Sequence, residues 1–308
     1  MKIILIDSNV KDVDKFCKIL STNTNDFKVT SSINEIDEKD VEVAIIWLNV
    51  PKYLDQLINL KLLLICGSGI DHIVNSPDLP RNIPTLRLVD PYLRNRVTNY
   101  VLRQILKHYF PSLSPFNEGI QNISGKIDNL NKPKIGIMGL GMIGGFMANK
   151  LIEVGFEVCG WVRSSRPRTI DEVYIGHNQL KDFAKNCEVL VCQLPLTKAT
   201  YKILNSTLFN LLPNRAYIIN VGRGSHLEEA ELISALDSEK LSGACLDVFE
   251  VEPLPLNHIF HTHPKITITP HIAGYVGADT QAPYAARIIT SFYNDEEVVG
   301  WVDYHAHY

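Results

Sequence analysis

Three residues able to do acid–base and anion chemistry stand near the ends of apolar, strand-like runs. Arg223 follows "IINVG", Glu252 lies in "LDVFEVEP", and His271 follows "ITITP". Open α/β sheets bind ligands beyond the carboxyl ends of their strands, so such residues can meet at one site. Singly, each also has a structural explanation: a surface or capping arginine, an acid in a Pro-rich loop, and a histidine donating to a backbone carbonyl.

Together, these side chains suit proton transfer to an anionic substrate. A protonated histidine can act as general acid. A carboxylate on its other ring nitrogen fixes the tautomer and favours the imidazolium. A forked, permanently charged arginine can clamp a carboxylate and polarise a neighbouring carbonyl.

A glycine-rich turn precedes these residues in the chain. "KIGIMGLGMIGG" places Gly139, Gly141 and Gly144 in G-x-G-x-x-G spacing, after a strand-like run and before a helical pattern. In that context, glycines allow a tight turn, close approach of a pyrophosphate and close helix–strand packing. The helix N-terminus offers free N–H groups to phosphates. The pattern favours a dinucleotide site over a purely structural turn.

A basic segment, "VRSSRPR", ends the next strand-like run. An NAD site usually has an acid here for the ribose 2′-hydroxyl, whereas this chain has none. Arginine grips a 2′-phosphate through charge-assisted hydrogen bonds. Arg163 and Ser164 therefore predict NADP(H) as the preferred cofactor, with NAD(H) also possible, and Arg166 or Arg168 assisting. The alternative is a solvated basic loop, which competes best at Arg168.

Short apolar runs alternate with helical patterns along the whole chain, which predicts parallel sheets covered by helices on both faces. A helix is expected over 97–110, and a polar break over 111–132 divides the pattern in two. The predicted strands are 2–7, 41–47, 61–67, 84–88, 132–139, 156–162, 188–194, 216–222, 243–249 and 265–270.

The composition is that of a globular protein, with 45% hydrophobic and 21% charged residues in 308. A net charge of −4 argues against nucleic-acid binding, and no apolar run is long enough to span a membrane. Six scattered cysteines, without a C-x-x-C pair, are expected to be reduced thiols of a cytoplasmic protein. The histidines show no metal-ligand spacing, so no metal is expected.

Five segments, in order and spacing, resemble the D-isomer-specific 2-hydroxyacid dehydrogenases, and most closely the glyoxylate/hydroxypyruvate reductase A subgroup. They are "GLGMIG" (139–144), "LPLT" (194–197), "NVGRGS" (220–225), "GACLDVFEVEPLP" (243–255) and "TPHIAG" (269–274). The resemblance implies two Rossmann-like domains, one flavodoxin-like and one dinucleotide-binding, with a cleft between them. Residues 1–98 plus 286–308 would bind substrate, and 99–285 would bind the cofactor. It also implies a homodimer.

The resemblance further implies reduction of a small 2-oxo acid by NADPH, with Arg223, Glu252 and His271 catalytic. Trp47, Ser68 and Gly69 would bind the substrate, the last two through "CGSGIDHI" (66–73). Asp247 and Val221 would orient the nicotinamide amide. The expected cofactor-binding set is Gly139, Gly141, Met142, Ile143, Gly144, Arg163, Ser164, Arg166, Leu194, Pro195, Thr200, Val221, Gly222, Asp247, His271 and Gly274.

Some residues leave the substrate open. Trp47 would shrink the pocket toward glyoxylate and hydroxypyruvate, whereas Tyr92 and Tyr275 could narrow it further or stack on an aromatic oxo acid. Arg94 is expected to face solvent; Arg96 either does the same or extends the anion site. Asn99 replaces an acid usual in the family. Remaining alternatives are a reductase of larger, phenylpyruvate-like acids and a non-catalytic NADP(H) sensor.

Overall fold

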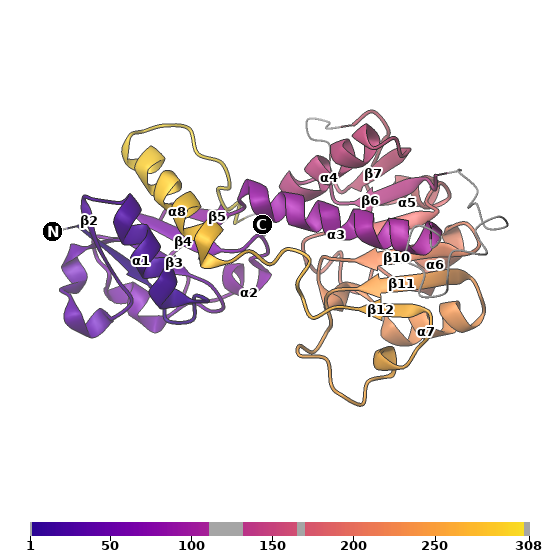
Figure 1. The fold of residues 1–308 in the computed structure, drawn as a ribbon, viewed down its shortest axis with the longest axis horizontal. Helices are drawn as coiled ribbons and strands as arrows, with labels where there is room; N and C mark the ends of the chain where they lie inside the picture. Colours follow the sequence, from indigo (N-terminus) through magenta and orange to yellow (C-terminus); the bar gives the residue numbers. More distant parts are fainter. Residues whose placement is uncertain (1, 111–131, 165–169, 305–308) are drawn as a thin grey trace, which may run out of the picture. The chain divides into compact units, whose positions relative to one another are not determined.

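The computed structural model describes residues 2–110, 132–164 and 170–304. The chain divides into two compact units, Met1–Leu93 with Val276–Tyr308, and Arg94–Tyr275 (Figure 1). The boundaries expected after residues 98 and 285 fall inside helices α3 (Pro91–Tyr109) and α8 (Ala278–Tyr293). The unit boundaries instead lie near the start of α3 and just before α8. Assigning a substrate or cofactor role to each unit stays a prediction.

The first unit is built on a five-stranded parallel sheet in the order β2-β1-β3-β4-β5, which is the flavodoxin-like order. Alternate residues of the strands point to opposite faces. Ile4 and Ile45 pack under α1 and α8, which lie against each other (Figure 1), while Ile3 and Ile46 face Leu54 and α2. The strands are β1 (Lys2–Ile6), β2 (Phe27–Thr30), β3 (Val41–Ile46), β4 (Leu62–Cys66) and β5 (Thr85–Leu88). The helices are α1 (Val13–Asn23), η1 (Ile33–Glu35), η2 (Glu38–Asp40), η3 (Lys52–Gln56), α2 (Asp71–Val74) and α8.

The second unit contains a seven-stranded parallel sheet in the order β12-β11-β10-β9-β6-β7-β8. Numbered from β6, this is the doubly wound dinucleotide-binding order with one added strand. Helices α5, α6 and α7 cover one face, while α3 and α4 cover the other. The strands are β6 (Ile135–Met138), β7 (Val158–Val162), β8 (Val173–Ile175), β9 (Val189–Cys192), β10 (Ala216–Asn220), β11 (Leu241–Leu246) and β12 (Ile266–Ile268). The helices are α3, α4 (Met142–Glu153), η6 (His177–Gln179), α5 (Leu180–Ala184), α6 (Ser206–Leu211), η7 (Gly224–His226), α7 (Glu229–Asp237) and η8 (Ile259–His261).

The predicted α/β class with two parallel sheets is confirmed, and each of the ten predicted strands is present. Two further strands, β2 and β8, were not predicted because they are short edge strands without a buried apolar run. Helix α3 begins earlier than expected. Asp90 caps it by accepting the Leu93 N–H at 2.7 Å, and Pro91 fits the first helical position. Within the described residues, no helix is long and apolar enough to cross a membrane.

Candidate active site

The glycine turn joins β6 to α4 in the second unit. A Cβ on Gly139, whose φ is +98°, would lie 2.7 Å from the Gln193 carbonyl oxygen. A Cβ on Gly144 would lie 1.9 Å from the Gly139 carbonyl oxygen. Gly141, by contrast, has open space where a Cβ would be. The outer glycines are therefore required by the protein's own packing, and the middle one leaves the backbone open to a ligand. This arrangement fits a dinucleotide pyrophosphate at the N-terminus of α4.

Arg163 and Ser164 follow β7, the strand beside β6, and both are exposed. The Gly139 N–H donates to the Trp161 carbonyl at 2.9 Å, so the glycine turn and the basic segment leave the same edge of the sheet side by side. The described part of this segment, 163–164, contains no carboxylate. Arg166 and Arg168 lie outside the described residues.

Two buried polar residues shape the loop after β10 that carries Arg223. The Asn220 amide donates to the Arg223 carbonyl at 2.9 Å and accepts the Gly222 N–H at 3.1 Å. The His226 Nδ1 accepts the Arg223 N–H at 3.1 Å, and its Nε2 lies 3.3 Å from the Pro195 carbonyl oxygen. A neutral ring protonated at Nε2 satisfies both contacts. These residues fix the backbone at Arg223 and connect it to the loop after β9.

Asn220 and His226 were not singled out from the sequence. Asn220 could have been found from the sequence, because it is a polar residue at the end of the apolar run "YIIN". A polar group buried at such a position must form hydrogen bonds. Nearby, Leu194, Val221 and Gly222 are buried. Thr200 donates its hydroxyl to the Pro195 carbonyl at 2.7 Å.

Glu252 and His271 are brought together from the loops after β11 and β12. The His271 Nδ1 lies 2.8 Å from the Glu252 Oε2, and the Phe249 N–H donates to Oε1 at 3.0 Å. The His271 side chain is 49% exposed and the Glu252 side chain 36%. Partial burial alone would raise the pKa of Glu252. The hydrogen bonds from His271 and Phe249, and the positive charges of His271 and Arg223, outweigh it and lower that pKa.

The guanidinium of Arg223 is near enough to Glu252 for its positive charge to contribute to the lowered pKa of that carboxyl. The Arg223 Nη1 donates to the Gly222 carbonyl at 2.9 Å. His271 itself has a left-handed backbone with φ of 52°, a conformation that costs energy outside glycine and often marks functional positions. The second unit thus assembles all three residues predicted to be catalytic.

Asp247 holds the loop that presents His271. It is 1% exposed, and its carboxylate accepts the N–H groups of Ile272 at 2.9 Å and Ala273 at 2.8 Å. It also accepts the Thr269 hydroxyl. Burial raises the pKa of Asp247 despite these hydrogen bonds. Asp247 therefore organises segment 269–273, and its predicted contact with a nicotinamide amide stays a prediction. Met142 and Ile143 begin α4, directly after Gly141. Gly274 directly follows Ala273.

The first unit places its three predicted substrate residues together at the carboxyl edge of its own sheet. Trp47 follows β3 and is partly buried. Ser68 and Gly69 follow β4, after Gly67, whose φ is +116°. A Cβ on Gly67 would lie 3.8 Å from the Trp47 Nε1, so the indole borders this loop. Arg87, which was not predicted, donates to the Ser68 carbonyl at 3.0 Å.

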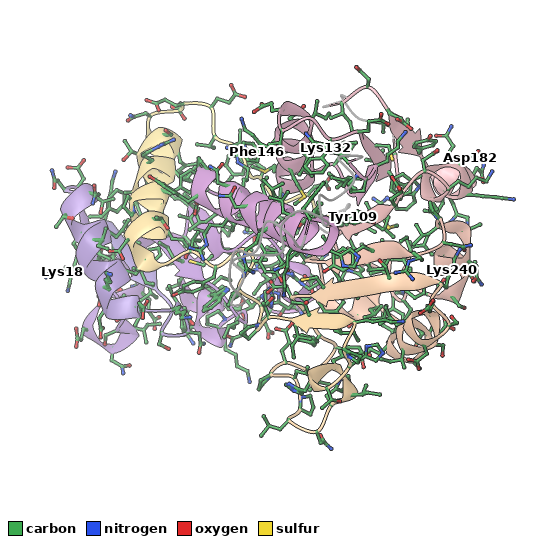
Figure 2. All side chains as sticks on the ribbon, turned by 45° about the vertical axis from the view of Figure 1, so that its right-hand side comes forward. Lys18, Tyr109, Lys132, Phe146, Asp182 and Lys240 are labelled. Carbon is green, nitrogen blue, oxygen red and sulfur yellow. The ribbon has the colours of Figure 1, made fainter. Side chains whose placement is uncertain are left out.

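The arginines at the start of α3 differ in environment. The expectation that Arg94 faces solvent is wrong. It is half-buried, its guanidinium carbon lies 5.1 Å from the centre of the Phe146 ring, and its Nε is buried. Phe146 belongs to α4 and is labelled in Figure 2. A guanidinium stacks well on an aromatic face, so Arg94 is held by packing within the second unit. Arg96 and Asn99 are exposed, as are Tyr92 and Tyr275.

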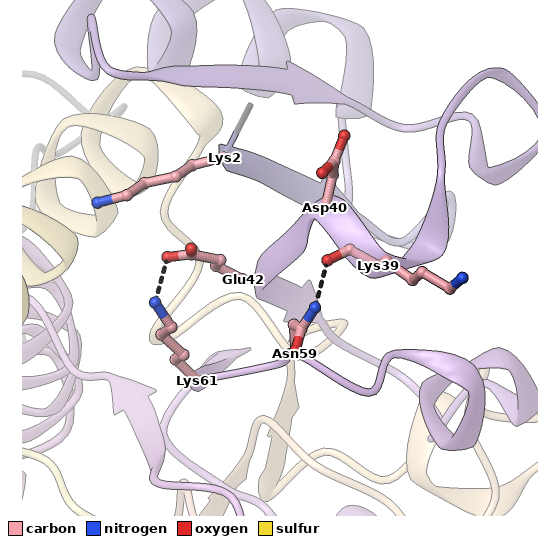
Figure 3. A pocket seen from close by; sticks show the side chains of 6 residues that line it. All are labelled: Lys2, Lys39, Asp40, Glu42, Asn59 and Lys61. Carbon is pink, nitrogen blue, oxygen red and sulfur yellow. Dashed lines mark hydrogen bonds and ion pairs between the residues drawn. The ribbon is translucent and has the colours of Figure 1, made fainter.

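A charged hollow of about 340 Å³ lies at the amino edge of the first sheet (Figure 3). Its walls include Glu42, which pairs with Lys61 at 3.0 Å, and Asn59, which donates to the Lys39 carbonyl at 2.7 Å. It lies at the opposite edge from Ser68 and Gly69, so we do not assign it to the candidate site. Among the described residues, no group of three or more His, Cys, Asp or Glu side chains is placed to hold a metal.

Comparisons with known proteins show the family of the chain. Residues 106–273, more than half of the chain, match the family described as D-isomer specific 2-hydroxyacid dehydrogenase, NAD binding domain. Glyoxylate/hydroxypyruvate reductase A of Salmonella paratyphi C is 34% identical over 281 residues, covering 87% of this chain and 88% of that protein.

Two solved structures match along essentially their full length. A D-isomer specific 2-hydroxyacid dehydrogenase from Xanthobacter autotrophicus Py2, in complex with NADPH and MES, has 29% identity and a TM-score of 0.87, covering 100% of this chain and 99% of that one. An NADPH-dependent glyoxylate/hydroxypyruvate reductase from Sinorhizobium meliloti, in complex with NADP and sulfate, has 28% identity and a TM-score of 0.81, covering 100% of both chains. The chain therefore belongs to the D-isomer specific 2-hydroxyacid dehydrogenases, a family of NAD(P)-dependent oxidoreductases.

Proposed function

We propose that this protein reduces small 2-oxo acids, glyoxylate and hydroxypyruvate foremost, to the 2-hydroxy acids with NADPH. The observation that carries the proposal is the Glu252–His271 hydrogen bond of 2.8 Å with Arg223 close enough to lower the pKa of Glu252. A proton donor, the group that orients it and a permanent cation are what reduction of an anionic carbonyl compound needs. Relatives with reductase names support the same reaction.

Each of the site residues has a separate role in the proposed reduction. The nicotinamide, when bound, supplies a hydride to the carbonyl carbon. His271 gives the proton on Nε2 to the carbonyl oxygen, because Nδ1 is engaged by Glu252, and it regains a proton from solvent. Arg223 binds the substrate carboxylate and stabilises the charge growing on the oxygen. The N–H groups of Ser68 and Gly69 hold the other carboxylate oxygen.

The cofactor preference rests on the glycine turn and the basic segment beside it. Gly139, Gly141 and Gly144 would receive the pyrophosphate. Arg163 and Ser164 would hold the 2′-phosphate, for which arginine supplies a forked donor. Two relatives of known structure contain NADPH or NADP. Met142, Ile143, Leu194, Pro195, Thr200, Val221, Gly222, Asp247 and Gly274 would line the rest of the cofactor pocket.

Trp47 supports a small substrate, because an indole beside the carboxylate loop leaves less room than a smaller side chain. Consumption of NADPH and NADH should be followed with glyoxylate, hydroxypyruvate, pyruvate and phenylpyruvate in parallel. We expect the highest kcat/KM for NADPH with the first two acids. A preference for phenylpyruvate would replace the substrate assignment, and NADPH binding without turnover of any acid would favour a sensor. We also propose a homodimer, which light scattering coupled to gel filtration would test.

A further inference from the structure

Arg87 is a permanently charged residue in the middle of a buried strand. Its neighbours in β5, Leu86 and Leu88, are fully buried, whereas Arg87 is half-buried. A charged side chain in such a position is costly unless a polar group receives it. Its Nη1 donates to the Ser68 carbonyl oxygen at 3.0 Å, so the guanidinium reaches the loop beyond the carboxyl end of the neighbouring strand.

The register of the sheet explains this reach. In the parallel pair of β4 and β5, Arg87 lies opposite Ile65, and Ser68 comes three residues after Ile65 in the chain. Gly67, with φ of +116°, turns the chain directly after β4, which brings the Ser68 carbonyl within reach of the guanidinium. Open α/β sheets bind their ligands at this edge.

The Ser68 carbonyl belongs to the same peptide unit as the Gly69 N–H. A trans peptide is planar, and its C=O and N–H point in opposite directions. By holding the carbonyl on its own side, Arg87 directs the Gly69 N–H to the other side of the loop. A cationic donor on the carbonyl also polarises the peptide unit, which makes its N–H a stronger donor.

We propose that Arg87 is a positioning residue that orients and polarises the Gly69 N–H for the substrate carboxylate. The inference rests on the proposed function, in which that N–H receives a carboxylate oxygen. The positive charge also lowers the energy of an anion at the loop. Arg87 acts through the peptide unit, so its effect falls on binding of the acid and leaves cofactor binding unchanged.

The backbone of β5 does not depend on the arginine side chain. The Arg87 N–H donates to the Gly300 carbonyl at 2.9 Å, and the Val302 N–H donates to the Thr85 carbonyl at 3.0 Å. A substitution at position 87 therefore leaves the strand paired on this side. Arg81 offers a matched control, because its Nη2 also donates to a backbone carbonyl of this unit, that of Val74, at 3.3 Å.

The test compares wild type, Arg87→Met, Arg87→Lys and Arg81→Met. It measures KM for glyoxylate, Ki for oxalate as an unreactive dicarboxylate, Kd for NADPH by fluorescence, and Tm. For Arg87→Met we expect KM and Ki to rise at least about tenfold, as for loss of a charged hydrogen bond, with the Kd for NADPH unchanged. Arg87→Lys keeps the charge without the fork and should recover part of the loss. Arg81→Met should leave KM and Ki at the wild-type values.

If Arg87→Met keeps the wild-type KM and Ki, the inference about Arg87 is overturned. Turnover of glyoxylate by the wild-type protein would still support the proposed function in that case. An equal rise in Arg81→Met would also overturn it, because general loosening of the unit would then explain the effect. A wild-type protein that neither reduces an oxo acid nor binds oxalate would remove the proposed function and this inference together.

Discussion

Replacing Glu252 by Gln tests the proposed acid catalyst with a minimal change of shape. The carboxylate uses one oxygen for the Phe249 N–H at 3.0 Å and the other for His271 at 2.8 Å. A glutamine has a single carbonyl oxygen, so it can accept from only one of these two donors. The variant therefore loses the negative charge beside His271 in either orientation of the amide, and it also loses one of the two hydrogen bonds.

The expected loss follows from the strength and exposure of the pair. A hydrogen bond to a charged group contributes about 1.5–3 kcal/mol. Because the two side chains are 49% and 36% exposed, solvent screening favours the lower end of that range. We therefore expect kcat to fall about 10- to 30-fold. The Kd for NADPH should stay within about twofold, because the glycine turn and the basic segment are untouched.

Steady-state kinetics with glyoxylate at saturating NADPH measures this effect. Glu250→Gln is the matched control, since Glu250 lies in the same loop and pairs with Lys202 at 2.8 Å. The control should retain wild-type kcat. The catalytic reasoning is refuted if Glu252→Gln keeps kcat within about threefold of wild type. A parallel collapse of NADPH binding would instead show that the loop had been disrupted.

Four further predictions concern pH and the cofactor site. Because the pKa of Glu252 is lowered in the folded protein, its carboxylate stabilises the fold at neutral pH. It loses that effect only as pH falls below about 4.5, the ordinary pKa of a glutamate carboxyl. The Tm difference between wild type and Glu252→Gln should therefore shrink at acidic pH, and a Tm difference that stays constant with pH would contradict the lowered pKa of Glu252. Arg163→Asp should raise the ratio of KM for NADPH to KM for NADH at least about tenfold, whereas Arg215→Asp, an exposed arginine at the opposite edge of the same sheet, should leave the ratio unchanged. Gly144→Ala should lower stability by about 1–3 kcal/mol or more in thermal unfolding, because its Cβ would lie 1.9 Å from a carbonyl oxygen. Gly141→Ala, with open space at that point, should keep its Tm and lose NADPH affinity; a normal affinity would argue against a pyrophosphate there.

Most strands of both sheets were predictable because buried strands have a recognisable sequence pattern. Central parallel strands are covered on both faces and read as continuous apolar runs. The edge strands β2 and β8 are short and only partly buried, and neither stood out as an apolar run. The start of α3 was also available, since an aspartate before a proline is a common helix N-terminus. The apolar period that begins at Val97 instead placed the expected start six residues after Pro91, where the helix begins.

Less of the candidate site than of the fold was predictable from the sequence, because its polar residues find their hydrogen-bond partners in distant segments. Strand ends locate Arg223, Glu252 and His271, because parallel strands share one carboxyl edge. The contacts that hold the loops of the candidate site join segments that are distant in sequence: His226 contacts the Pro195 carbonyl, and Arg87 of β5 donates to the Ser68 carbonyl. A polar residue in an apolar run shows that some partner must exist, but nothing in its own segment identifies that partner. Residues proposed to bear the chemistry are therefore recognisable from the sequence, whereas the residues that hold their loops in place can be assigned only from the folded structure.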